Sequence, residues 1–192
     1  MGIPIEELAQ PFELTVKNKT YRIGLQVCED LWCKDYRRKG QALNMSRYLI
    51  ENGAELIVNI SASPWTNDKH DARDRRIQFL AKDVEQFVPF YYVNNVGPQN
   101  NGKNIITFDG GTTVYNEQGL PVICSQNAFT SDLLVVDHEN LPQSKSERKE
   151  SDAIAQKYQA IQSGLLYLKD MLGLPEHPKF VVGVSGGIDS AL

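Results

Sequence analysis

The pattern of hydrophobic and polar positions predicts strands along the first half of this chain. Residues 12–16 and 21–27 are short runs of β-forming residues, and the polar residues 17–19 between them are typical of a hairpin turn. Two later runs, at 55–60 and 88–96, are mainly apolar and predict buried strands. These four segments are expected to form the centre of a sheet.

Helices are predicted between the central strands, and hairpins after them. Apolar residues recur at helical spacing in residues 41–51 and 68–86. Strand–helix–strand units followed by hairpins predict an α/β fold with a mixed sheet covered by helices. Four short alternating runs separated by turn residues form the expected hairpins: 105–108, 112–115, 121–124 and 132–136.

The polar segment 138–151 mixes charges of both signs and predicts a linker between two domains. Ser151 is expected to cap the helix that follows it. Further on, an apolar run at 180–184 predicts one more buried strand. We therefore expect a first domain over residues 1–137 and the start of a second α/β domain over 152–192.

The composition is that of an ordinary globular protein, with 192 residues, 41% of them hydrophobic and 23% charged. The net charge of -4 argues against a nucleic-acid partner, which would need a basic surface. No apolar run approaches the roughly 18 residues that cross a bilayer, and no signal peptide is recognisable, so no membrane partner is expected. The three cysteines are an odd number and lack metal-ligand spacing, so a disulfide framework is not expected and the protein is predicted to reside in the reducing cytoplasm.

Cys28 stands at the C-terminal end of the strand predicted over 21–27, where open α/β sheets present reactive groups. Glu29 and Asp30 follow directly, which is an unusual environment for a buried sulfur. Histidines are scattered along the chain, so chemistry at this thiol would use another base. The alternative is that Cys28 is a small buried hydrophobic residue, because free cysteine is among the most buried residue types.

Residues 185–190 read SGGIDS and form a second candidate site. Glycines allow the backbone to approach an anion, serines offer hydroxyl donors, and the start of a helix attracts phosphate. The lysine of a Walker loop is missing. An ordinary turn between a strand and a helix is the alternative.

This loop resembles the PP-loop of the N-type ATP pyrophosphatases, whose signature is SGGxDS. Those enzymes bind ATP, release pyrophosphate and leave an adenylated carbonyl for attack by a nitrogen nucleophile. The resemblance implies a triphosphate site with Asp189 close to Mg²⁺. The residues that would hold ATP are Ser185, Gly186, Gly187, Asp189 and Ser190.

Three motifs resemble the glutaminase half of the glutamine-dependent NAD synthetases, a branch of the nitrilase superfamily: CEDLW (28–32), NISASPW (59–65) and FDGG (108–111). The order of a nitrilase-like part, a linker and a PP-loop strengthens the resemblance, because few other families join these modules. It implies a nitrilase-like α-β-β-α sandwich followed by the start of a doubly wound α/β PP-loop domain.

The resemblance also implies roles for individual residues. Cys28 attacks the side-chain amide of glutamine and releases ammonia. Glu29 matches a glutamate of the family, and its backbone N–H is placed to join an oxyanion hole; a surface carboxylate is the alternative. Ser63 and Lys69 match positions that hold the α-amino and carboxylate groups of glutamine, although Ser63 is equally explained as a turn residue before Pro64.

Two groups of the family mechanism, a general-base glutamate and an oxyanion-stabilising lysine, have no counterpart ahead of Cys28. The isolated chain is therefore expected to be an inactive fragment. A stand-alone nitrilase-type amidase is a further alternative, but the linker and the PP-loop argue against it. For the parent enzyme we expect glutamine, nicotinic acid adenine dinucleotide, ATP and Mg²⁺ as partners, and a homo-oligomer. Arg73, Arg75 and Arg76 are expected on a solvated helix face.

Overall fold

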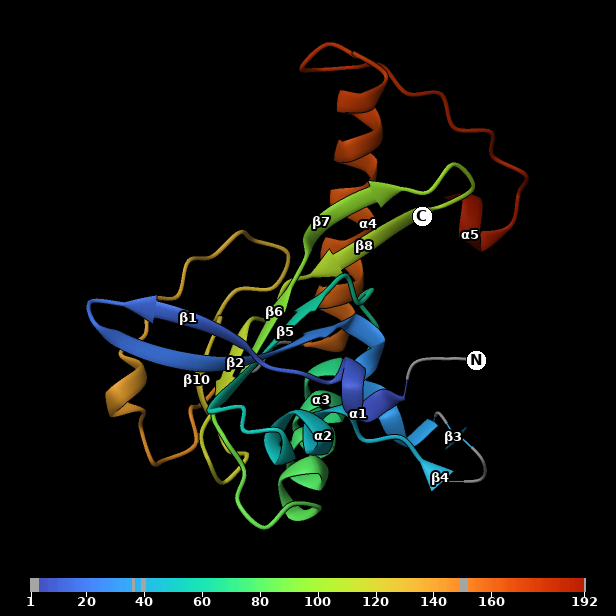
Figure 1. The fold of residues 1–192 in the computed structure, drawn as a ribbon. Helices are drawn as coiled ribbons and strands as arrows, with labels where there is room; N and C mark the ends of the chain where they lie inside the picture. Colours follow the sequence, from blue (N-terminus) through green and yellow to red (C-terminus); the bar gives the residue numbers. More distant parts are fainter. Residues whose placement is uncertain (1–3, 36, 39–40, 149–151, 192) are drawn as a thin grey trace.

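The computed structural model describes residues 4–35, 37–38, 41–148 and 152–191 (Figure 1). Its centre is a six-stranded mixed sheet in which the strands β2, β5 and β6 are parallel and the outer strands antiparallel. In sheet order the strands are β1 (Phe12–Val16), β2 (Lys19–Val27), β5 (Leu56–Ser61), β6 (Phe90–Asn94), β9 (Thr113–Tyr115) and β10 (Pro121–Cys124).

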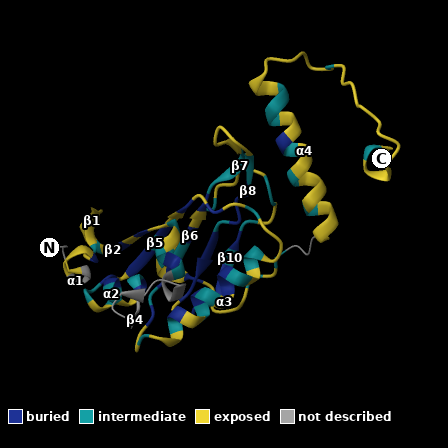
Figure 2. Ribbon diagram, turned by 90° about the vertical axis from the view of Figure 1, so that its right-hand side faces the viewer, coloured by how far each residue is buried: buried dark blue, intermediate teal, exposed yellow. Residues whose placement is uncertain are grey.

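Two helices, α2 (Met45–Glu51) and α3 (Lys69–Lys82), cover one face of the sheet (Figure 2). Gly24 lets α2 approach β2 closely, because a Cβ at this position would stand 3.2 Å from the side chain of Leu49. Apolar side chains of α3 pack on the sheet in the main core cluster, as the helical and strand periodicities predict. That cluster contains Leu31, Ile57, Ile77, Leu80, Phe87, Phe90, Tyr92 and Tyr115.

The opposite face of the sheet is apolar and partly open to solvent along β2, β5 and β6 (Figure 2). Side chains alternate along a strand, so Asn59 of β5 faces the helices while Ile60 faces away. Leu25, Val27, Ile60 and Val93 on this face are between 42% and 61% exposed. Towards β9 and β10 the same face is covered, because Val136 and Leu141 pack there with Val114 and Val122.

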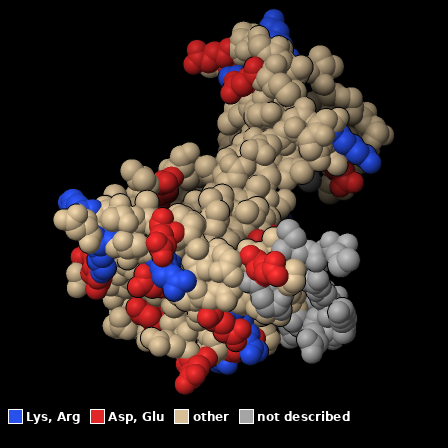
Figure 3. All heavy atoms as spheres, in the orientation of Figure 1, with Lys and Arg blue, Asp and Glu red and all other residues tan. Residues whose placement is uncertain are grey.

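The helix α4 (Ala153–Met171) extends away from the sheet and packs against a hairpin of β7 (Val96–Asn100) and β8 (Ile105–Asp109). Charged side chains of both signs are scattered over the face shown in Figure 3. None of the helices described here is long and apolar enough to cross a membrane. The remaining elements are α1 (Ile5–Leu8), η1 (Cys28–Asp35), β3 (Arg37–Arg38), β4 (Gln41–Ala42), η2 (His138–Asn140) and α5 (Ile188–Ala191).

Two helices begin later than the sequence predicts. The helix expected over 41–51 begins at Met45, because the side chain of Asn44 accepts a backbone hydrogen bond and caps it. The helix expected from Ser151 is capped by Asp152, and Ser151 itself lies outside the described residues. Several residues that could cap a helix stand close together at the start of both helices. The sequence therefore predicts that each helix exists more reliably than it predicts the residue at which the helix begins.

Two predicted strands are wrong. Residues 132–136 and 180–184 are apolar enough for strands, but in the structure both are irregular and their large side chains, such as Val135 and Val181, are exposed. A strand forms only where a neighbouring strand satisfies its backbone N–H and C=O groups. No described strand lies beside either segment, so an apolar pattern alone does not produce a strand there.

Candidate active site

Cys28 begins the short helix η1 at the point where β2 leaves the sheet. Its φ of +43° lies in the left-handed region, which costs a residue with a Cβ about 1 kcal/mol. The carboxylate of Asp30 accepts the backbone N–H of Val27 at 2.8 Å and closes the turn. Sharp turns from a strand into a helix hold a nucleophile out at the strand end. The structure thus places Cys28 where the sequence predicts, with a half-buried thiol.

Ser63 follows β5 at the same end of the sheet. Val27 pairs with Ile60, so the chain leaves β2 and β5 at the same level. Asn94, the last residue of β6, holds the backbone of Ser63: its Oδ1 accepts the Ser63 N–H at 2.8 Å, and its Nδ2 donates to the Ser63 carbonyl at 3.1 Å. Sequence reasoning missed this contact, although Asn94 stands near the end of a predicted strand.

Lys69 is the first residue of α3 and contacts η1. Its ammonium lies 5.4 Å from the ring centre of Trp32, four residues after Cys28. Such cation–π contacts contribute about 0.5 to 1 kcal/mol at exposed sites. Glu29 is exposed on the same segment. The structure therefore gathers Cys28, Glu29, Ser63 and Lys69 at one end of the parallel strands.

Arg73 is buried under this end of the sheet, which corrects the expectation of a solvated helix face. Only 1% of the residue is exposed, whereas Arg75 is solvated as predicted. The Nη2 of Arg73 lies 3.4 Å from Oδ1 of Asp109, and its guanidinium lies 4.7 Å from the ring centre of Tyr92. A signal was available in the sequence, because Arg73 precedes the apolar Ile77 by four residues and shares its helix face.

Polar side chains form a layer between the sheet and the helices. Gln26, Asn59 and Tyr92 stand side by side on β2, β5 and β6, because the register pairs Gln26 with Asn59 and Asn59 with Tyr92. Buried polar groups without partners are rare and call for a functional explanation. In the described part of the chain such atoms all belong to this layer: Gln26 Oε1, Asn59 Nδ2, Arg73 Nε, Tyr92 Oη and Asp109 Oδ2.

A second buried ion pair anchors the predicted linker to α3. Both Nη atoms of Arg148 bind the carboxylate of Asp74, at 2.5 and 2.9 Å, and the hydroxyl of Tyr115 donates to the same carboxylate at 2.8 Å. Burial disfavours the charge of Arg148, but the hydrogen bond and charge of Asp74 outweigh it and raise the pKa of Arg148. The predicted linker is therefore fixed to α3 at Arg148.

A polar cavity of about 550 Å³ adjoins this cluster. Lys69, His70 and Arg148 contribute to its wall, but neither Cys28 nor Ser63 does. Lys69 thus borders the cavity on one side and contacts η1 on the other. The thiol of Cys28 is therefore not part of this cavity.

His70 gives the folded chain a pH-dependent stability. Burial, followed by the charge of Arg73, lowers the pKa of His70, although Asp109 at 3.3 Å favours its protonation. Because the unfolded chain then binds the proton more readily, the free energy of unfolding should fall as pH drops below the ordinary histidine pKa of about 6.5. Urea unfolding between pH 5 and pH 8, chosen to bracket this value of about 6.5, would measure the effect.

The comparison variants for this measurement are His70→Gln and His177→Gln. His177 is exposed, so its replacement should leave the pH dependence as it is in the unsubstituted chain. His70→Gln should make the free energy of unfolding less dependent on pH over this range. Equal pH dependence in the unsubstituted chain and in His70→Gln would contradict the prediction.

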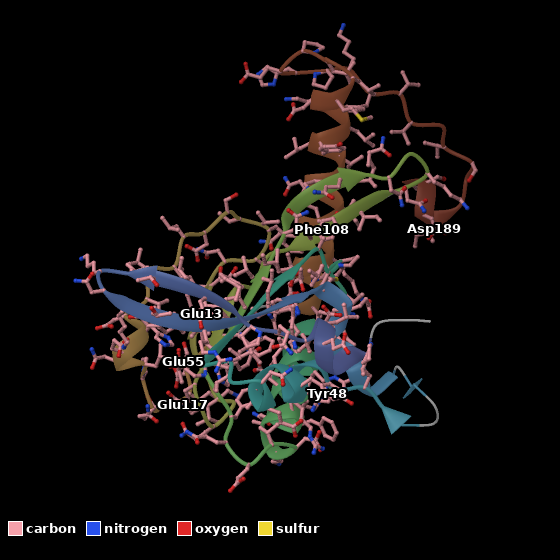
Figure 4. All side chains as sticks on the ribbon, viewed as in Figure 1. Glu13, Tyr48, Glu55, Phe108, Glu117 and Asp189 are labelled. Atoms are coloured by element: carbon pink, nitrogen blue, oxygen red, sulfur yellow. The ribbon has the colours of Figure 1, made fainter. Side chains whose placement is uncertain are left out.

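The predicted phosphate loop lies away from the sheet, beyond α4, as the position of Asp189 in Figure 4 shows. The hydroxyl of Ser190 accepts the backbone N–H of Ser185 at 3.1 Å and donates to the carbonyl of Gly187 at 3.0 Å, so the loop closes on itself. Gly186 has a φ of +87°, which favours glycine. No described group of three His, Cys, Asp or Glu residues could hold a metal, but Mg²⁺ is often bound by a single carboxylate together with substrate phosphates. The donors of this loop fit that arrangement.

Comparison with known proteins gives consistent relatives, although no protein-family model matches the chain. Curated proteins from Synechocystis sp. and Xanthomonas campestris, both described as glutamine-dependent NAD(+) synthetases, are 33% identical to this chain over 177 and 181 residues. The matches cover 91% of this chain in both cases, but only 30% and 29% of the relatives. The chain therefore spans about 30% of the length of these relatives.

A solved structure supports the fold. The glutamine-dependent NAD+ synthetase from Acinetobacter baumannii, determined in complex with adenosine diphosphate, matches with a TM-score of 0.70 and 24% sequence identity. The match covers 95% of this chain and 31% of that chain. At this level of identity the likeness establishes the fold. The predicted α/β fold, with a mixed sheet and helices packed on it, is confirmed.

Proposed function

We propose that this chain is part of an ATP-dependent, glutamine-hydrolysing NAD synthetase, because curated glutamine-dependent NAD(+) synthetases match 91% of its length at 33% identity. In the proposed reaction, ammonia from glutamine amidates adenylated nicotinic acid adenine dinucleotide and gives NAD, AMP and pyrophosphate. The observation that supports the glutaminase half most directly is the left-handed turn that presents Cys28 at the end of β2.

The proposed glutaminase chemistry begins at the thiolate of Cys28. It adds to the side-chain carbonyl carbon of glutamine, the C–N bond breaks, and ammonia leaves. Water then hydrolyses the thioester to glutamate and restores the thiol. The backbone N–H of Glu29 donates to the oxyanion, and Ser63 and Lys69 bind the α-amino and carboxylate groups of glutamine. Lys69 does so as a point charge, without the two parallel bonds that an arginine could make.

The groups that take the thiol proton and support the oxyanion are proposed to lie outside this chain. The resemblance implies a glutamate and a lysine for these roles, and no residue ahead of Cys28 matches either one. On its own the chain should therefore show no glutaminase turnover. The unpaired thiols of Cys28 and Cys124 support a reducing cytoplasm as the place of the enzyme.

The loop 185–190 is proposed to bind the triphosphate of ATP. When bound, ATP supplies the adenylyl group that makes the carboxylate of nicotinic acid adenine dinucleotide reactive. The backbone N–H groups of Gly186 and Gly187 are the proposed phosphate donors, and the hydroxyls of Ser185 and Ser190 turn from their bonds within the loop to donate when phosphate binds, with Asp189 close to Mg²⁺. The hydrogen bonds through Ser190 support this role, because they hold these donors in one compact loop.

The proposal is tested by assaying the purified full-length enzyme with nicotinic acid adenine dinucleotide, ATP and Mg²⁺. NAD should form with either glutamine or ammonium as nitrogen source, and AMP and pyrophosphate should appear in equal amounts. Release of ADP and phosphate in their place would overturn the assignment of the loop. Glutaminase turnover by the 192-residue chain alone would show that the missing groups are not needed.

A further inference from the structure

Arg73 is a buried cation that none of the proposed chemistry uses. It is 1% exposed and lies one helical turn after Lys69. We propose that Arg73, together with its partner Asp109, is a positioning residue that sets Lys69 and Ser63 for the α-amino-acid end of glutamine. This inference rests on the proposed function, because it assigns a purpose to residues that surround the proposed glutamine contacts.

On the helix side, Arg73 and Asp109 fix the first turn of α3. The Nη2 of Arg73 lies 3.4 Å from Oδ1 of Asp109, and its Nη1 lies 3.5 Å from Nδ1 of His70, the neighbour of Lys69. Asp109 ends β8 and begins the DGG loop of the FDGG motif. A Cβ on Gly111 would stand 2.4 Å from His70 and 3.0 Å from Arg73, so the loop backbone packs directly on this turn.

On the strand side, the guanidinium of Arg73 contacts β6, the strand that also carries Asn94, the hydrogen-bond partner of Ser63. It lies 4.7 Å from the ring centre of Tyr92. Burial raises the pKa of Tyr92, and the charge of Arg73 and the nearby hydroxyls of Ser61 and Ser63 offset part of this rise. Tyr92 lies on β6 two residues before Asn94, whose side chain holds the backbone of Ser63 at 2.8 and 3.1 Å. One side chain thus connects the segments that carry both proposed glutamine contacts.

A purely structural role explains this arrangement poorly. Replacing buried ion pairs by well-packed apolar residues is often neutral or stabilising, so an ion pair is a poor way to fill a core. Here the Nε of Arg73 is left without a hydrogen-bond partner, and the Oδ2 of Asp109 faces only the Nε2 of His70, at 3.3 Å. Holding these charges in fixed positions costs desolvation free energy. Such an arrangement is typical of residues that position neighbouring side chains.

The test is affinity labelling of Cys28 in the 192-residue chain. The probe is the chloromethyl ketone of L-glutamine, in which a CH₂Cl group replaces the amide nitrogen; the thiolate displaces chloride and forms a C–S bond. Iodoacetamide, which lacks the α-amino-acid end, is the reference reagent. Mass spectrometry assigns the label, and Cys28→Ala provides the blank.

Labelling of the unsubstituted chain by the ketone should saturate with concentration. Arg73→Met should raise the half-saturating concentration by about tenfold or more, equivalent to about 1.4 kcal/mol of binding free energy, while the iodoacetamide rate stays the same. Arg73→Lys keeps the positive charge but loses the planar guanidinium with its several N–H donors. Its half-saturating concentration should lie between those of the unsubstituted chain and Arg73→Met. Arg75→Met, on the exposed side of the same helix, should change neither reaction.

The outcomes separate this inference from the proposed function. Saturable labelling that is unchanged in Arg73→Met overturns the positioning role alone. Non-saturable labelling of the unsubstituted chain overturns both the glutamine contacts and the positioning role. Because Arg73→Met could unfold the chain, Asp109→Asn serves as the near-isosteric second variant, with circular dichroism as the check of folding; it should weaken ketone binding and spare the iodoacetamide reaction.

Discussion

Replacing Cys28 with alanine should lower glutamine-driven NAD formation by the full-length enzyme at least about 10⁴-fold, because the covalent intermediate can no longer form. Ammonium-driven formation should continue, since added ammonia bypasses the glutaminase chemistry. Both rates are measured as NAD formed with saturating ATP. Alanine carries a Cβ like cysteine, so the left-handed backbone at position 28 keeps a similar cost and folding is little disturbed.

Cys124→Ala is the matched control for this substitution. Cys124 is buried on β10, and burial raises the pKa of its thiol, so little of it is present as the reactive thiolate. Its replacement should preserve the ratio of glutamine-driven to ammonium-driven rates. A Cys28→Ala enzyme in which the two rates fall equally would assign Cys28 a structural role and remove the nucleophile from the proposal.

Replacing Asp74 with alanine should cost about 3 to 5 kcal/mol of stability, because it leaves a buried guanidinium without its partner. The side chains of Asp74 and Arg148 are only 9% and 19% exposed, so water compensates little for the lost pair. The hydroxyl of Tyr115 also loses its acceptor. The free energy of unfolding in urea, measured on the 192-residue chain, gives the change directly.

Asp71→Ala is the control for this experiment, because Asp71 is exposed on the first turn of the same helix. It should alter stability by no more than about 0.5 kcal/mol. Arg148→Met and the double variant complete a cycle that isolates the interaction of Asp74 with Arg148. If Asp74→Ala and Asp71→Ala were equally stable, the ion pair would contribute nothing measurable to the fold.

Most strands and helices of the sheet region could be located along the chain from the sequence, because those elements show their own periodicity. The strand that ends at Cys28 and the helix over 69–82 are examples. The strands expected at 132–136 and 180–184 do not form, because pairing depends on a neighbour that local patterns do not supply. The turn at Cys28 could be located, but its left-handed backbone could not be foreseen.

The polar part of the site was harder to predict, since charge says little about burial. Arg73 and Arg75 are the same residue type two positions apart, yet one is buried and the other exposed. Only the helix period distinguishes them. Arg148 stands in a segment whose composition is typical of a linker, and its partner Asp74 lies 74 residues away in sequence. No local pattern connects the two.

The ion pair of Arg148 with Asp74 tethers the start of α4 to α3. From Arg148 to Asp152, where α4 begins, four peptide units span at most about 14 Å, so any swing of α4 turns about a point tethered close to Asp74. With 19 residues, α4 is a rigid lever about 28 Å long. A rotation at its base would therefore move the far end of α4, at Met171, much further than it moves Asp152.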